Sequence, residues 1–152
     1  MAQQGAGFDM SKLSTSDKIT AGGAIALLIW TFFPFWYKLG GDVGEVLEAF
    51  GGDSGINGWR GVTFLAALLA IVAIIEVVLK VVGTNMSMPL KRGLLHLALA
   101  GVGALLTILG LIASPSGFSA SWGAFVGIVF ALVWVYGAYM MYQEPSSEGG
   151  TA

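Results

Sequence analysis

Four apolar runs, each about twenty residues long, dominate the pattern of hydrophobic and polar positions along the chain. They cover residues 19–37, 62–82, 93–113 and 122–142. A helix of this length crosses a hydrocarbon core of roughly 30 Å. The runs lack the alternation of apolar and polar residues that is typical of strands in a membrane barrel. The sequence therefore predicts an all-α integral membrane protein, a bundle of four transmembrane helices.

The composition agrees with this prediction. Hydrophobic residues make up 56% of the 152 residues, charged residues only 11%, and the mean hydropathy is +0.81. The chain has no cysteine, which excludes disulfides, thiolate metal sites and thiol catalysis. With a net charge of −2 and no long basic cluster, it also lacks the positive surface needed to bind nucleic acid.

Polar segments flank the four runs. Residues 1–17 are predicted to form a flexible cytoplasmic N-terminus that ends in a capping box, made by Ser14 and Asp17, at the start of the first helix. Residues 143–152 have too few apolar side chains to fold, which predicts a disordered cytoplasmic tail. The transmembrane domain then occupies residues 18–142. Its first run is too long for a signal peptide and has no cleavage site after it, so we expect it to be retained.

The distribution of lysine and arginine predicts the orientation. Only Lys38 and Arg60 flank the loop between the first two helices, whereas five basic residues flank the N-terminus and the loop between the second and third helices: Lys12, Lys18, Lys80, Lys91 and Arg92. Positive residues are enriched on the cytoplasmic side of membrane proteins. Both termini are therefore predicted to be cytoplasmic, in a multi-pass protein of the cell membrane, the bacterial inner membrane.

The first outer loop contains a short amphipathic pattern. Apolar residues recur at helical spacing between glycines, at Val43, Val46, Leu47 and Phe50. This pattern predicts a short helix that lies on the outer leaflet or caps the bundle. The other outer loop, residues 114–121, is short, which makes the third and fourth helices antiparallel neighbours.

Aromatic residues crowd the end of the first run, in "WTFFPFWYK", residues 30–38. Tryptophan and tyrosine gather where a helix leaves the hydrocarbon core. The sequence therefore predicts an interfacial aromatic belt at the outer surface, formed by Trp30, Phe33, Phe35, Trp36, Tyr37, Trp59 and Trp122. Pro34 removes an amide hydrogen and predicts a kink. The carbonyl that this opens offers an alternative, a site for a lipid headgroup or a quinone.

The same stretch carries a resemblance to a known group of proteins. "KLSTSDKITAGGAIALLIWTFFPFW", residues 12–36, is followed by "INGW", residues 56–59, and by three further apolar runs. This arrangement resembles small, uncharacterised actinobacterial integral membrane proteins with four helices and an FFPW-like end to the first helix. The chain has FFPFW, with an extra phenylalanine. The resemblance implies the same topology and carries no established activity.

Two ionisable residues lie well inside the runs, Glu76 in the second and His96 in the third. Each is about 10 Å from the loop that joins the two helices, so they are expected at one depth. Lys80 and Arg92 lie one turn nearer the cytoplasm and complete an intramembrane polar cluster. Such a cluster either fixes the register of the helices or passes a proton. The sequence favours the first function, because no deeper acid or histidine continues a path.

Small residues mark the faces through which the helices are expected to pack. The third run carries a stripe of small or polar residues, which includes Ala100, Gly103, Thr107 and Gly110. The fourth run carries Gly123, Gly127 and Ala131 at intervals of four residues, a motif of close helix pairs. We expect this motif to pack against the first helix, with pairing to a second copy as the alternative.

No set of residues indicates catalysis. The chain has no nucleophile with a base and an acid, no phosphate-binding loop and a single histidine, so neither an enzyme nor a cofactor is predicted. The acidic residues of the first outer loop are expected to be solvated, so no metal site is predicted. The sequence predicts a non-enzymatic accessory or assembly component that contacts the lipid bilayer and either other membrane subunits or further copies of itself. The alternative is a small transporter or proton-coupled carrier that uses Glu76 and His96.

Overall fold

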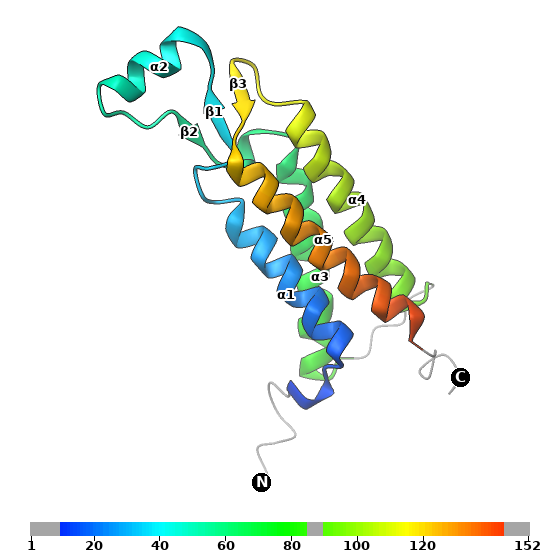
Figure 1. Cartoon of the computed structure of the whole chain (residues 1–152). Helices are drawn as coiled ribbons and strands as arrows, with labels where there is room; N and C mark the ends of the chain where they lie inside the picture. The colour runs from blue at the N-terminus through cyan, green and yellow to red at the C-terminus, as the bar shows by residue number, and fades with distance from the viewer. Residues whose placement is uncertain (1–9, 85–89, 145–152) are drawn as a thin grey trace.

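The computed structural model of the chain describes residues 10–84 and 90–144. Four helices lie side by side in a bundle: α1 (Thr15–Trp30), α3 (Thr63–Val82), α4 (Arg92–Ile112) and α5 (Trp122–Gln143) (Figure 1). Helix α5 packs against α1 and α4, and α3 packs against the same two helices from the other side. The prediction of a mostly helical protein is confirmed.

Three of these helices are long and apolar enough to cross a membrane, namely α3, α4 and α5. Helix α1 has 16 residues and is shorter. The first turns of α1 and α4 meet the last turns of α3 and α5 at one end of the bundle, here named the charged end (Figure 1). The flexible N-terminus predicted for residues 1–17 and the disordered tail predicted for residues 143–152 lie partly outside the described residues, at 1–9 and 145–152. Of the described remainder, Met10–Lys12 form a 3₁₀ turn, α1 begins at Thr15, and Gln143 is the last residue of α5.

The start of α1 has the predicted capping box. The Ser14 hydroxyl accepts a hydrogen bond from the Asp17 amide at 3.2 Å, and the Asp17 carboxylate accepts one from the Ser14 amide at 2.9 Å. Two amide groups that a helix start leaves without partners are thereby satisfied. A short 3₁₀ turn, η2 (Met10–Lys12), precedes the cap.

Helix α1 ends at Trp30, so the prediction of a helix up to Tyr37 with a kink at Pro34 is wrong. Proline lacks an amide hydrogen and disfavours helical geometry in the residue before it. The chain therefore leaves the helix before Pro34 and turns into strand β1 (Tyr37–Leu39).

A three-stranded antiparallel sheet closes the other end of the bundle, here named the sheet end. Strand β1 lies between β2 (Gly55–Ile56) and β3 (Phe118–Ala120), with Tyr37 opposite both Ile56 and Ala120. The sheet joins the loop between α1 and α3 to the loop between α4 and α5, and the 3₁₀ turn η3 (Gly58–Arg60) leads from β2 towards α3. The all-α prediction misses this sheet, because none of its strands is longer than three residues.

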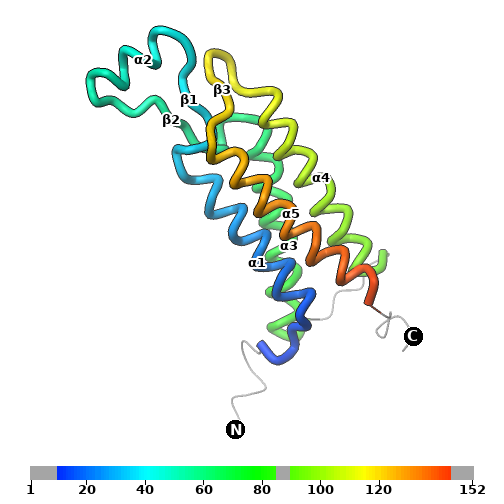
Figure 2. The backbone as a smooth tube through the Cα atoms, in the orientation of Figure 1, coloured from blue at the N-terminus to red at the C-terminus, as the bar shows by residue number. Residues whose placement is uncertain are grey.

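The amphipathic helix predicted in the first outer loop is present as α2 (Gly41–Ala49). It lies beyond the sheet, away from the four long helices, and packs chiefly against β1 (Figures 1 and 2). The expectation that it caps the bundle is therefore wrong. Its apolar side chains remain exposed.

Small residues let large rings enter the bundle. The Trp134 ring of α5 lies against Gly103 of α4, while its backbone lies against Gly23 of α1, so that a methyl group at either glycine would clash. Trp36 lies against Gly127 in the same way. All seven residues of the two packing motifs are buried inside the chain: Ala100, Gly103, Thr107, Gly110, Gly123, Gly127 and Ala131.

Candidate functional site

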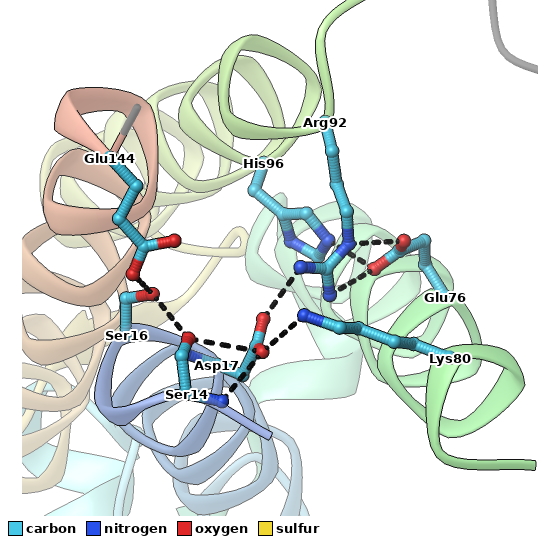
Figure 3. A network of polar contacts seen from close by, with 8 residues as sticks. All are labelled: Ser14, Ser16, Asp17, Glu76, Lys80, Arg92, His96 and Glu144. Carbon is cyan, nitrogen blue, oxygen red and sulfur yellow. Dashed lines mark hydrogen bonds and ion pairs between the residues drawn. The ribbon is translucent and has the colours of Figure 1, made fainter. Parts of the chain in front are cut away.

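A cluster of charged side chains fills the charged end of the bundle. It contains Asp17 from α1, Glu76 and Lys80 from α3, and Arg92 and His96 from α4 (Figure 3). The side chains of Asp17 and His96 are completely buried. The depth predicted for Glu76 and His96 agrees with the structure, which brings all four residues of the predicted cluster together.

Arg92 is the centre of the cluster and joins three helices. Its Nε and Nη2 donate hydrogen bonds to the two carboxylate oxygens of Glu76, at 2.6 and 2.9 Å. Its Nη1 donates to Oδ1 of Asp17 at 2.6 Å. The planar guanidinium suits this geometry, because its donors form a fixed fork that matches a carboxylate. A lysine at this position would offer a single charged nitrogen and could not make the same three hydrogen bonds.

Asp17 is the member of the cluster that the sequence did not predict. Its Oδ2 accepts a hydrogen bond from Nζ of Lys80 at 2.6 Å, while the same carboxylate caps α1 and contacts Arg92. In the sequence, the capping box was a sufficient reason for an aspartate at position 17, so no partner on another helix was predicted. A signal was nevertheless present, because Asp17 and Arg92 both lie in the first turn of a helix that starts at the charged end.

His96 has a partner on one side of its ring only. Its Nε2 lies 2.6 Å from Oε2 of Glu76, whereas Nδ1 is buried and has no hydrogen-bond partner. A Glu76 carboxylate that accepts two hydrogen bonds from Arg92 pairs with the tautomer of His96 that carries a proton on Nε2. Among the described residues, two other buried side-chain atoms lack partners, Oγ1 of Thr20 and Nε1 of Trp134.

The cluster is electrically balanced. The two acidic side chains, Asp17 and Glu76, face two basic ones, Lys80 and Arg92. Ser16 extends the network sideways by a hydrogen bond from its hydroxyl to Glu144, at the end of α5 (Figure 3). All four long helices therefore contribute to one polar network. Within residues 10–84 and 90–144, no group of three or more histidine or acidic side chains is arranged to hold a metal ion.

The predicted aromatic belt divides into two parts. Trp36 and Tyr37 are completely buried at the sheet end, so their assignment to a lipid-facing belt is wrong. Tyr37 shares a hydrogen bond of 2.9 Å with Thr63 at the start of α3. The remaining five residues stay near the surface: Trp30, Phe33, Phe35, Trp59 and Trp122. The ring centroid of Trp122 lies 5.8 Å from that of Trp30 and 5.0 Å from that of Phe35.

The buried ring of Trp36 also forms a hydrogen bond with the backbone carbonyl at the end of α1. Its Nε1 donates to the Trp30 carbonyl at 2.7 Å. A lipid headgroup or a quinone would need this oxygen as its polar partner at the aromatic stretch. The protein satisfies the oxygen internally, so the structure gives this alternative no support.

No family model, no curated protein and no solved structure matches the chain. The resemblance to small actinobacterial membrane proteins with four helices therefore rests on the sequence motifs of the first helix and of residues 56–59.

Replacing Glu76 or His96 with glutamine is expected to lower the unfolding temperature modestly, and the double variant should lose less than the sum. The two side chains share one hydrogen bond, and once the first substitution has weakened it, the second has less to remove. Polar interactions between membrane helices contribute about 0.6 kcal/mol on average. Thermal unfolding of the wild type and the three variants in one mild detergent measures the coupling. Strictly additive losses would mean that this hydrogen bond contributes nothing to stability.

Proposed function

We propose that the protein is a non-enzymatic, multi-pass protein of the bacterial inner membrane that serves as an accessory or assembly component of a membrane complex or homo-oligomer. One observation carries this proposal: the apolar face of α2 is exposed, outside the bundle, on a sheet that holds it away from the helices (Figure 1). Large apolar faces that remain exposed mark interaction sites. The charged cluster, in contrast, is engaged in joining the protein's own helices.

The proposal includes four membrane spans. Helix α1 is about 24 Å long at 1.5 Å per residue, which is shorter than the usual hydrocarbon core. It nevertheless packs along α3 and α5 within the same bundle, which supports a fourth span beside them. The turn of aromatic residues after Trp30 supplies the remaining length. In this arrangement the charged end faces the cytoplasm, in agreement with the excess of lysine and arginine there.

Cysteine substitutions test this orientation. Ser116 in the loop before β3 and Leu90 just before α4 are both exposed, so that either can take a cysteine without loss of packing. We expect an impermeant thiol reagent added to intact cells to label Ser116→Cys and to leave Leu90→Cys unlabelled until the cells are opened. The chain has no other cysteine, so the signal is specific. Labelling of Leu90→Cys in intact cells would mean that the orientation is the reverse of the proposed one.

Co-purification from the native membrane tests the accessory function. We expect the tagged protein, extracted with a gentle detergent at its natural expression level, to elute with other subunits or as an oligomer. A protein that elutes as a monomer without partners, both in detergent and in nanodiscs at every ratio of protein to lipid, would contradict the proposal.

A proton-coupled carrier is the second candidate, favoured by the buried Nδ1 of His96, which has no partner although Nε2 of the same ring contacts Glu76. This candidate predicts a pH-driven flux in liposomes. Glutamine at position 76 or 96 should abolish the flux and preserve the fold, because glutamine keeps the shape and loses the titratable proton. A folded wild-type protein without flux under an imposed pH gradient would exclude this candidate.

A further inference from the structure

Helix α2 is attached to the sheet by one of its faces. Gly44 approaches the carbonyl of Leu39 so closely that a side chain would clash with it. One turn further along, the Glu48 carboxylate accepts hydrogen bonds from the Ser54 hydroxyl at 2.5 Å and from Lys38, whose Nζ lies at 3.3 Å. These two partners hold the pKa of Glu48 below its ordinary value. The rotation of α2 about its own axis is thereby fixed.

Because of this attachment, the apolar face of α2 points towards solvent. Phe50 is 85% exposed and Val43 is 68% exposed, and Val46 and Leu47 between them are exposed as well. All four residues lie on one side of the helix, away from Gly44 and Glu48. Among the described elements, none packs over this face (Figures 1 and 2). The face is therefore an uncovered apolar surface in the isolated protein.

An acidic edge borders this surface. Asp42 lies next to Val46 around the helix, and Glu45 lies beside Asp42 and further from the apolar face. Both are exposed, and neither forms an ion pair with another described residue. The chain has no lysine or arginine between Lys38 and Arg60, and Lys38 is already paired with Glu48. The surface thus combines apolar side chains with an uncompensated negative edge.

The charge of this edge decides between the possible occupants. Helices that lie on a membrane carry lysine and arginine on the polar face, and an anionic leaflet repels carboxylates. The charges on α2 are of the opposite sign, which disfavours the expectation that α2 lies on the outer leaflet. A second copy would bring another acidic edge to the same interface. A partner with positive charge beside apolar side chains complements both features.

We propose that the exposed face of α2 docks a segment of another protein, outside the membrane, in which apolar side chains are flanked by lysine or arginine. This inference rests on the proposed function and names the class of its partner. Val46 and Phe50 make the apolar contacts, and Asp42 and Glu45 pair with the basic residues of the segment.

Site-specific photo-crosslinking in native membranes tests the proposal. A photoreactive amino acid replaces Val46 in the full-length protein, and a second variant carries it at Leu132, an exposed residue of α5 on the proposed lipid-facing side of the bundle. We expect Val46 to crosslink to a partner protein at a peptide with lysine or arginine beside apolar residues, identified by mass spectrometry. Adding Asp42→Lys and Glu45→Lys should lower the yield about tenfold or more, because like charges are brought together.

Ser116→Lys is the matched control, since it adds positive charge outside α2 at an exposed position and should leave the yield unchanged. A crosslink from Val46 to lipid or to a second copy would overturn the inference, and so would a yield that is insensitive to the charge reversal. Crosslinks to protein from Leu132 without any from Val46 would overturn the inference and leave the proposed function standing. An absence of protein crosslinks from both positions would contradict both.

Discussion

Replacing Arg92 with methionine is expected to destabilise the protein more than Glu76→Gln does, by up to about 3–5 kcal/mol, the loss found in soluble proteins when one member of a buried ion pair is removed. Glutamine at position 76 still accepts a hydrogen bond from Arg92, whereas methionine at position 92 donates none. The change leaves Asp17 without its partner on α4 and leaves Glu76 with His96 alone. Methionine keeps an unbranched apolar stem in place of the arginine stem, so that the loss reports on the charge and its hydrogen bonds. Thermal unfolding in mild detergent, followed by tryptophan fluorescence, measures it.

Two further variants show whether the cluster causes this loss. Lys91→Met removes a neighbouring positive charge at an exposed position and should change stability little. Combining Arg92→Met with Asp17→Asn and Glu76→Gln removes the two carboxylates that the first change leaves without Arg92, while Lys80, whose side chain is 36% exposed, can turn towards solvent. This variant should recover most of the stability, because replacing a buried ion pair by neutral side chains is often neutral. An equal loss in Lys91→Met, or no recovery in the triple variant, would contradict the assignment of Arg92 as the centre of the cluster.

Trp36→Ala is expected to cost about 3–5 kcal/mol, as removal of a buried large aromatic side chain does. The ring is completely buried against Gly127 and Gly58, and its Nε1 satisfies the carbonyl at the end of α1. Alanine would leave a cavity between α1 and α5 and a carbonyl without this donor. Thermal unfolding followed by circular dichroism measures the loss, since this signal does not depend on the tryptophan that the substitution removes.

Phe32→Ala is the matched control for Trp36→Ala. Phe32 belongs to the same aromatic stretch and is 60% exposed, with its ring against Trp59. Its removal should cost much less, since little buried apolar surface is removed with it. Equal losses of stability in the two variants would indicate that Trp36 belongs to the surface belt and would contradict its burial in the bundle.

The parts of the fold that the sequence predicted are those set by short-range periodicity. Apolar runs of helical length predicted α3, α4 and α5 nearly to their observed ends. The constant rise of a helix also placed Glu76 and His96 at one depth, because a hairpin of two helices fixes both distances from the same loop. The helical spacing of Val43, Val46 and Phe50 was enough to predict helix α2. It was not enough to predict the direction in which the apolar face of α2 points.

The parts that the sequence did not predict depend on interactions between distant segments. A strand of two or three residues has no measurable alternation, so that β1, β2 and β3 are recognisable only once they pair. Tryptophan is a residue type typical of membrane interfaces, and only the turn after Trp30 directs the Trp36 ring into the bundle. Asp17 had a sufficient local explanation as a helix cap. In each case the local pattern was compatible with two environments, and tertiary packing selected one.

The pairing of the strands also implies an order in which parts of the protein can assemble during synthesis. In the orientation proposed above, β1 can pair with β2 once the loop between α1 and α3 has been translocated, whereas its other edge pairs with β3, which leaves the ribosome only after α4. The amides of Ser121 and Gly123 then donate to the carbonyls of Trp36 and Phe35. In that orientation, β1 has an unpaired edge outside the membrane until α4 and α5 have been inserted, and such edges recruit other chains. A nascent chain that stalls before Phe118 would therefore display a ready signal for aggregation or for proteolytic quality control.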